Sequence, residues 1–100
     1  MKKLFVQKFG GTSVASPSRI KAVADIILED IKLGNSIVVV LSAMGNQTQD
    51  LINLANEIDI EPNAREYDAL VSTGEQVSVA LLAMALQQKG CPAKSYTAYQ

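Results

Sequence analysis

The residues best suited to chemistry in this chain form two glycine turns, each after a short apolar run. The first is Lys8-Phe9-Gly10-Gly11-Thr12-Ser13. Paired glycines let backbone amides approach an anion closely, the lysine adds a mobile positive charge, and the hydroxyls add donors. This composition is typical of a phosphate cradle, although it is neither a Walker A loop nor a dinucleotide fingerprint. A tight strand-to-helix turn beside a solvated lysine explains the same residues equally well.

The second turn is Ser42-Ala43-Met44-Gly45, in which small residues leave room for a ligand against the backbone. A loop that simply requires a glycine is the alternative. If both turns end neighbouring parallel strands, they meet at one edge of the sheet, where open α/β folds bind ligands. Two glycine turns in that arrangement favour ligand binding more than either turn does alone.

Two further polar groups are ambiguous. Ser72-Thr73-Gly74-Glu75 fits a helix capping box, in which Ser72 caps the helix and Glu75 folds back onto it. The residues alone favour this structural interpretation. A functional Glu75 would instead offer its carboxylate to a substrate ammonium group. Thr48 is either a helix N-cap or a substrate-binding hydroxyl.

These residues need a strand–helix–strand unit to position them. Leu4 to Phe9 predicts a first strand, and Ser16-Pro17 predicts the start of a helix. An apolar stripe from Ile20 to Ile31 continues that helix until Gly34, which suits a left-handed C-terminal residue. The run Ile37 to Leu41 predicts a second strand covered on both faces, parallel to the first through a right-handed crossover.

The second half of the chain predicts helices and the start of a third strand. One helix is expected over Gln49 to Ile58 and another over about Ala64 to Val71. After a break at Ser72-Thr73-Gly74, a helix over Glu75 to Lys89 is apolar nearly all round, which is typical of a helix buried between layers. Ala93 to Thr97 is expected to begin the third strand. In the first of these helices, the expected inward side chains are Leu51, Leu54, Ala55 and Ile58.

Composition narrows the classes of function. Nine basic and ten acidic residues in 100 give a net charge of −1, and the basic residues never cluster beyond Lys2-Lys3. This argues against nucleic-acid binding. One cysteine cannot form an internal disulfide, and the lack of histidine removes Ser-His-Asp catalysis and most zinc sites. With no secretory or membrane-spanning segment predicted, we expect a cytoplasmic protein.

Three ordered sequence blocks carry a resemblance to a known enzyme family. They are Lys8 to Val14, Val38 to Gly45, and Leu70 to Ser78. Together they resemble the aspartate kinases of the amino-acid kinase family. Any one block alone is weak, whereas three in order with plausible spacing are specific, and the likeness spans the whole chain.

The resemblance implies a three-layer α/β/α sandwich with a mainly parallel sheet, the carbamate kinase-like fold, in truncated form. It also implies transfer of the γ-phosphoryl group of ATP, with Mg²⁺, to the β-carboxylate of L-aspartate, which begins lysine, threonine and methionine biosynthesis. Residues 1–100 are then expected to be the N-terminal part of the catalytic domain, without its remainder or the regulatory ACT domains. By themselves they are expected to be inactive, and the complete chain to form a homodimer.

The resemblance further implies roles for individual residues. Lys8 would be the catalytic residue, stabilising the transferring phosphoryl group, because phosphoryl transfer needs positioning and charge neutralisation more than a covalent nucleophile. Thr48 and Glu75 would bind aspartate, with Glu75 taking its α-ammonium group. No residue of this segment is expected to bind the metal directly. The ATP-binding residues would be Lys8, Phe9, Gly10, Gly11 and Ser42.

Two alternatives remain at this point. The first is another amino-acid kinase, acting on glutamate, acetylglutamate, carbamate or uridylate, although the Ser-Thr-Gly-Glu block favours aspartate. The second is a non-catalytic α/β module whose turns bind a phosphate ligand or nothing.

Overall fold

The computed structural model describes residues 3–97 of the chain. The order of elements is β1 (Leu4–Phe9), α1 (Pro17–Lys32), β2 (Ser36–Leu41), α2 (Gln47–Ile58) and α3 (Ala64–Gln88). The predictions of β1, α1 and β2 are confirmed to within one residue. α2 is also confirmed, with a start at Gln47 in place of Gln49.

The ends of α1 follow directly from its sequence. The Ser16 hydroxyl accepts a hydrogen bond from the Arg19 amide at 3.3 Å, and Pro17 occupies the first helical position. At the other end, the amide of Gly34 donates to the Ile31 carbonyl, and Gly34 has a φ of 88°. Only glycine adopts that conformation without strain. The predicted cap and the predicted stop are therefore both confirmed.

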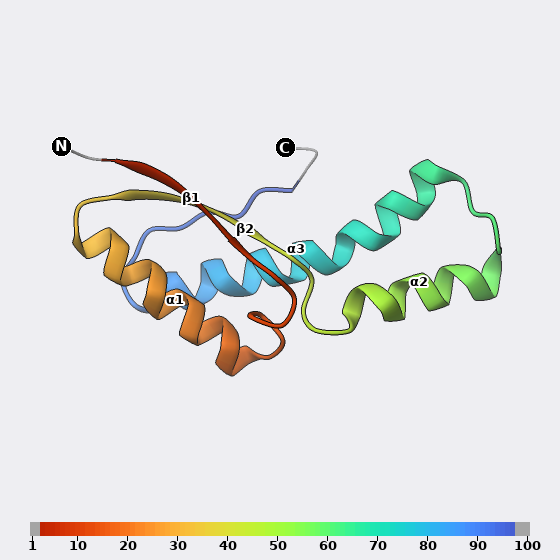
Figure 1. Cartoon of the computed structure of the whole chain (residues 1–100), viewed down its shortest axis with the longest axis horizontal. Helices are drawn as coiled ribbons and strands as arrows, with labels where there is room; N and C mark the ends of the chain where they lie inside the picture. The colour runs from red at the N-terminus through yellow and green to blue at the C-terminus, as the bar shows by residue number, and fades with distance from the viewer. Residues whose placement is uncertain (1–2, 98–100) are drawn as a thin grey trace.

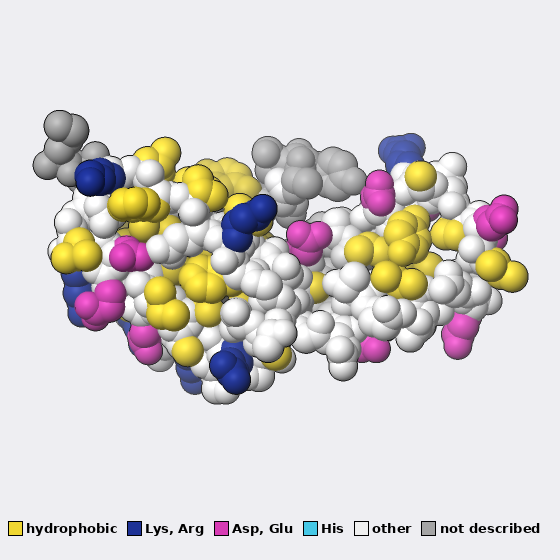
Figure 2. All heavy atoms as spheres, in the orientation of Figure 1, with side chains coloured by type: hydrophobic (Ala, Val, Ile, Leu, Met, Phe, Trp, Pro, Cys, Tyr) yellow, Lys and Arg dark blue, Asp and Glu magenta, His cyan; other side chains and the backbone are white. Residues whose placement is uncertain are grey.

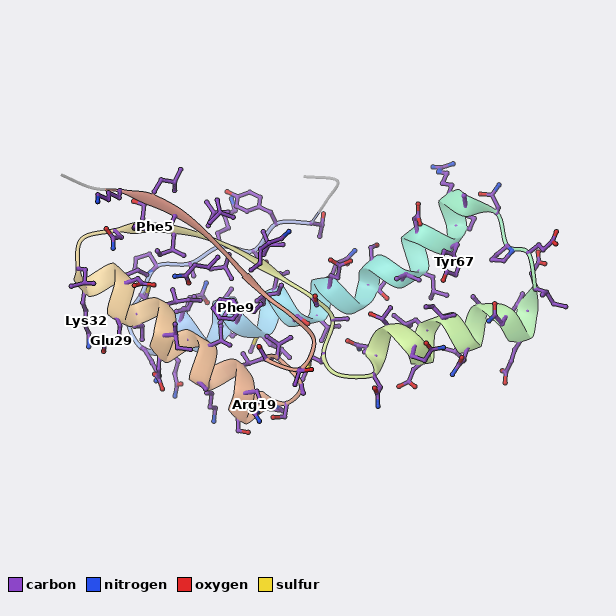
Figure 3. All side chains as sticks on the ribbon, in the orientation of Figure 1. Phe5, Phe9, Arg19, Glu29, Lys32 and Tyr67 are labelled. Carbon is purple, nitrogen blue, oxygen red and sulfur yellow. The ribbon has the colours of Figure 1, made fainter. Side chains whose placement is uncertain are left out.

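β1 and β2 pair in parallel, with Lys8 opposite Val40 and Phe9 opposite Leu41. α1 and α3 pack against the same face of this pair, as Figure 1 shows. On that face lies Phe9, which packs against the core (Figure 3). The core consists of Val14, Ile20, Val23, Ala24, Ile27, Leu41, Leu82, Leu86 and Cys91.

The opposite face of the sheet is exposed. Its apolar side chains are Leu4, Val6, Val38 and Val40, and all four are exposed. The prediction that β2 is covered on both faces is therefore not met by residues 3–97. They supply a sheet and one helical layer of the three-layer sandwich, because both α1 and α3 lie on the inner face.

The predicted break at Ser72-Thr73-Gly74 is wrong, because α3 runs through it without interruption. The hydroxyls of Ser72 and Thr73 donate to the carbonyls of Ala69 and Leu70, at 3.1 and 2.7 Å. Such bonds to the preceding turn let serine and threonine stay inside a helix. The capping box of Ser72 and Glu75 is therefore wrong as well. The helix is capped earlier, where the Asn63 side chain accepts from the amides of Arg65 and Glu66.

Two predictions for the C-terminal part are also wrong. The second half of α3 is not buried between layers, because only one side of it is covered and Met84 is 62% exposed. The third strand expected over Ala93 to Thr97 does not form, and the described tail has no regular structure. A cavity of about 430 Å³ lies between this tail, α1, β2 and α3.

The chain is elongated. Its radius of gyration is 15.3 Å, whereas about 13 Å is typical of a compact domain of this length. The elongation comes from residues 47–71, that is, α2, its connection and the first part of α3, which project from the sheet as a helical hairpin (Figure 1). We call these residues the arm.

α3 is also long and apolar enough to cross a membrane, judged by length and composition alone. This is weak evidence, since a core helix of a soluble protein passes the same test. In this fold α3 packs against α1, α2 and β2, and it buries Gly74, Ser78, Leu82 and Leu86 there. Packing therefore accounts for its apolar stripe.

Candidate active site

The two glycine turns lie side by side at the carboxyl ends of β1 and β2. The amide of Ser42 donates to the Phe9 carbonyl at 3.0 Å, and the amide of Gly45 donates to the Gly11 carbonyl at 3.1 Å. The expected juxtaposition of the two turns at one sheet edge is therefore confirmed. Lys8 precedes the first turn and is exposed, opposite Val40.

Gly11 is the glycine that lets the turns approach each other. A β-carbon at Gly11 would lie 3.1 Å from the carbonyl oxygen of Ala43 and 3.4 Å from that of Gly45. Both neighbours are backbone atoms, so neither can easily move away. A β-carbon at Gly10 would meet nothing within 4 Å. Gly10 therefore borders open space, and the backbone at Gly10 is accessible from solvent.

α2 starts immediately after the second turn. Asn46 is its N-cap but makes no side-chain capping bond. Thr48 lies within the helix, so the alternative in which Thr48 is the N-cap is wrong. Within residues 3–97, nothing accepts a hydrogen bond from the amides of Thr48 and Gln49. Unpaired amides and the helix dipole make such a start favourable for a negative charge.

Gly74 is the point at which α3 approaches the second turn and the start of α2. A β-carbon on Gly74 would lie 2.9 Å from Cβ of Ala43, and 3.4 Å from Oε1 of Gln47. Ala43 belongs to the second turn and Gln47 to the first turn of α2. Glu75 follows Gly74 on α3 and Thr48 follows Gln47 on α2, so each lies one residue from this contact.

Sequence reasoning missed this close approach. It treated Gly74 as a helix breaker, whereas a glycine inside a helical pattern also signals close packing of two backbones. The small residue Ala43 in the facing turn was the second part of that signal. Gln47 was missed too. Its Oε1 is buried and accepts no hydrogen bond within the described part of the chain.

A shallow cleft borders Glu75 on the side of the free edge of β2. It has a volume of about 260 Å³ and is lined by Val39 to Leu41, by Ser72, Glu75, Gln76 and Val79 of α3, and by Tyr96 and Thr97. Glu75 is exposed, and among residues 3–97 neither Glu75 nor Lys8 forms an ion pair. Both charges are therefore available to a ligand.

The residues predicted from the sequence fall into two neighbouring groups. Ala43 touches both, through Gly11 on one side and Gly74 on the other. Among residues 3–97 there is no group of three acidic, cysteine or histidine side chains that could hold a metal ion. The described residues therefore do not form a magnesium cage of their own. The groups are Lys8, Phe9, Gly10, Gly11 and Ser42 around the turns, and Thr48 and Glu75 beside Gly74.

The chain is similar in sequence to a known protein family and to several of its members. The profile of the Amino acid kinase family matches residues 3–100. An aspartokinase of Geobacillus stearothermophilus is 56% identical over 97 residues, and an aspartate kinase of Pseudomonas fluorescens is 57% identical over 99 residues. Each alignment covers 97% of this chain but 24% of the relative. The chain thus spans about a quarter of the length of the curated relatives it matches.

The fold has a close counterpart among solved structures. The crystal structure of an aspartate kinase from Synechocystis superposes with a TM-score of 0.88 at 56% identity. The match covers 91% of this chain and 16% of that chain. The α/β amino-acid kinase fold expected from the sequence is therefore confirmed.

Proposed function

Because this chain belongs to the amino acid kinase family, we propose that the complete protein transfers the γ-phosphoryl group of ATP to the β-carboxylate of L-aspartate. Support for aspartate as the substrate comes from relatives named aspartokinase or aspartate kinase, which are 56% and 57% identical. The observation that carries the proposal is the hydrogen-bonded pairing of the two turns, Ser42 to Phe9 and Gly45 to Gly11.

In this proposal the two turns bind the phosphates of ATP. The accessible backbone at Gly10 and the amide of Gly11 face the polyphosphate, with Ser42 beside them. Lys8 neutralises the charge that develops on the γ-phosphoryl oxygens. Fixed positive groups of this kind stabilise a transferring phosphoryl group, since its negative charge is spread over three oxygens.

The acceptor carboxylate is the nucleophile. One of its oxygens forms a bond to the γ-phosphorus, and the bond from that phosphorus to the β–γ bridging oxygen breaks, which releases ADP. The carboxylate is already ionised at neutral pH, so no general base is required. This chemistry accommodates a segment without histidine.

Aspartate would bind beside Gly74 in this proposal. The Glu75 carboxylate pairs with its α-ammonium group, and the Thr48 hydroxyl and the unpaired amides at the start of α2 accommodate negative charge. A magnesium ion would neutralise ATP phosphates, and the described residues include no group of three carboxylate, cysteine or histidine side chains that could hold it. Mg²⁺ commonly keeps its waters and binds substrate phosphates instead of a protein cage.

The relatives are about four times longer than their aligned part, so we propose that residues outside this segment complete the catalytic domain and carry any regulatory domains. Residues 1–100 alone would be inactive. We further propose a cytoplasmic homodimer.

A substrate panel with the complete protein tests the proposal. With MgATP, acyl phosphate trapped by hydroxylamine is expected with L-aspartate, because the roles proposed for Glu75 and Thr48 require an amino-acid acceptor. No comparable rate is expected with glutamate, N-acetylglutamate, carbamate or uridylate. Phosphorylation of one of these in place of aspartate would assign another amino-acid kinase. ATP binding without any turnover would favour a non-catalytic phosphate-binding module.

A further inference from the structure

The cleft beside Glu75 has a second polar side chain, that of Ser72, on the same wall. The wall that α3 contributes to this cleft of about 260 Å³ consists of Ser72, Glu75, Gln76 and Val79. Intervals of three and four residues place side chains on one face of a helix. Gly74, which contacts the second turn, does not line the cleft. Ser72 and Glu75 therefore border the same space, one helical turn apart.

The hydroxyl of Ser72 is available to a ligand only as a hydrogen-bond acceptor. Its proton is donated to the Ala69 carbonyl, with an oxygen–oxygen distance of 3.1 Å. A serine hydroxyl has one proton and two lone pairs, so the lone pairs are what remain for another group. Ser72 is only partly buried. A ligand with an N–H donor can therefore reach its oxygen, whereas a carboxylate or phosphate oxygen finds no proton there.

An ammonium group has a use for such an acceptor beside a carboxylate. Its three N–H bonds diverge, so one carboxylate leaves at least one of them without a partner. Two acceptors that are each about 2.8 Å from one tetrahedral nitrogen lie about 4.6 Å apart. Residues three apart on a helix have β-carbons roughly 5–6 Å apart. The Ser72 oxygen and the Glu75 carboxylate can therefore contact the same nitrogen.

The charges around the cleft favour a cation. Its lining residues include one carboxylate and no basic side chain. Lys94 lies over the Tyr96 ring, 5.5 Å from the ring centroid, and does not line the cleft. The arm, which ends one residue before Ser72, contains six carboxylates and one arginine, and Figure 2 shows acidic side chains distributed over it. The surroundings of the cleft therefore differ from those of the glycine turns beside Lys8, which suit an anion.

We propose that Ser72 determines specificity for the acceptor substrate, and that its oxygen accepts a hydrogen bond from the α-ammonium group of the amino acid, beside Glu75. This inference rests on the proposed function. The Ser72 oxygen strengthens the binding of an acceptor that carries a free α-amine. It adds nothing for an analogue that lacks the amine, because its own proton is held by Ala69.

Steady-state kinetics of the complete protein test this role, with succinate as a probe that has both carboxylates of aspartate and no ammonium group. Ser72→Ala is expected to raise the KM for L-aspartate about tenfold and to leave kcat within twofold, because a hydrogen bond to a charged group is lost equally from the bound substrate and the transition state. The constant for inhibition by succinate should stay within twofold of the parent. Ser72→Thr keeps the hydroxyl, so its KM should stay within threefold.

Thr73→Ala is the matched control. Thr73 donates to the Leu70 carbonyl at 2.7 Å, much as Ser72 donates to Ala69, but Thr73 is exposed and does not line the cleft. Its KM for L-aspartate should stay within twofold of the parent. Both alanine variants should keep the melting temperature of the parent, because alanine favours a helix.

The possible outcomes separate this inference from the proposed function. If the parent phosphorylates L-aspartate, three results would overturn the role of Ser72 alone: an unchanged KM for Ser72→Ala, an equal rise in KM for Thr73→Ala, or a parallel weakening of inhibition by succinate in Ser72→Ala. A parent protein that does not phosphorylate L-aspartate would overturn the proposed function and this inference with it.

Discussion

Replacing Lys8 with alanine in the complete protein is expected to lower kcat by about 10²–10³, equivalent to roughly 2.7–4 kcal/mol of transition-state stabilisation. Lys8 lies one residue before the end of β1, ahead of the first turn, and it forms no ion pair within residues 3–97. Its positive charge is therefore available to the phosphoryl group that moves.

The melting temperature separates this effect from a loss of structure. Lys8 is exposed and opposite Val40 at the sheet surface, so Lys8→Ala should leave the melting temperature nearly unchanged. Lys32→Ala serves as the control for removing a lysine, and its kcat should equal that of the parent. Lys8→Arg keeps the charge but alters its geometry, so partial recovery is expected. A kcat within threefold of the parent for Lys8→Ala would contradict the proposed role.

The second large effect is expected for Gly74→Val. An alanine or valine normally favours a helix over glycine by up to about 1 kcal/mol. Here the added β-carbon would lie 2.9 Å from Cβ of Ala43, and both atoms are attached directly to backbone. α3 must therefore move away from the second turn, which typically costs about 1–3 kcal/mol. Denaturant unfolding of the complete protein measures this loss.

A matched variant isolates the close contact. Ala69→Val likewise places a valine on α3, but Ala69 is exposed, so only a few tenths of a kcal/mol are expected. Gly74→Val should also raise the KM for aspartate, since it displaces Glu75. Glu75→Gln should raise that KM without affecting stability, because Glu75 is exposed and makes no ion pair in the described part of the chain. Equal stability of Gly74→Val and Ala69→Val would refute the packing argument.

Local sequence signals predicted the first half of the fold well. The Ser16 cap, the stop at Gly34 and the apolar runs of β1 and β2 each act within a few residues, and the structure has each of them in place. The meeting of the two turns followed from the same signals, because parallel strands joined by one crossover end at the same edge.

The second half depended on contacts that are distant in sequence. Ser72 and Thr73 suggest a break when read alone, but their hydroxyls bond to the preceding turn and Gly74 packs on Ala43. The helix continues because its packing outweighs the local preference. The tail at Ala93 to Thr97 has strand-forming residues, yet a strand requires regular pairing along an edge, and the tail has no regular structure, with a cavity between part of it and β2.

The candidate site was likewise predictable only where local signals determine it. Lys8, Gly10, Gly11 and Ser42 were predicted to meet because each lies at the carboxyl end of a strand or just after it. The position of Glu75 relative to Thr48 could not be predicted, since it depends on the contact between Gly74 and Gln47. The exposure of Leu54 and Ile58 was equally hidden, because periodicity identifies an apolar face without identifying what covers it.

A crystal structure of the complete protein with a non-hydrolysable ATP analogue and L-aspartate tests the central claim most directly. The account predicts Nζ of Lys8 about 3 Å from an oxygen of the β- or γ-phosphate, with the turns at Gly10 and Ser42 enclosing the polyphosphate. Phosphates bound away from both turns, with Lys8 directed into solvent, would contradict it.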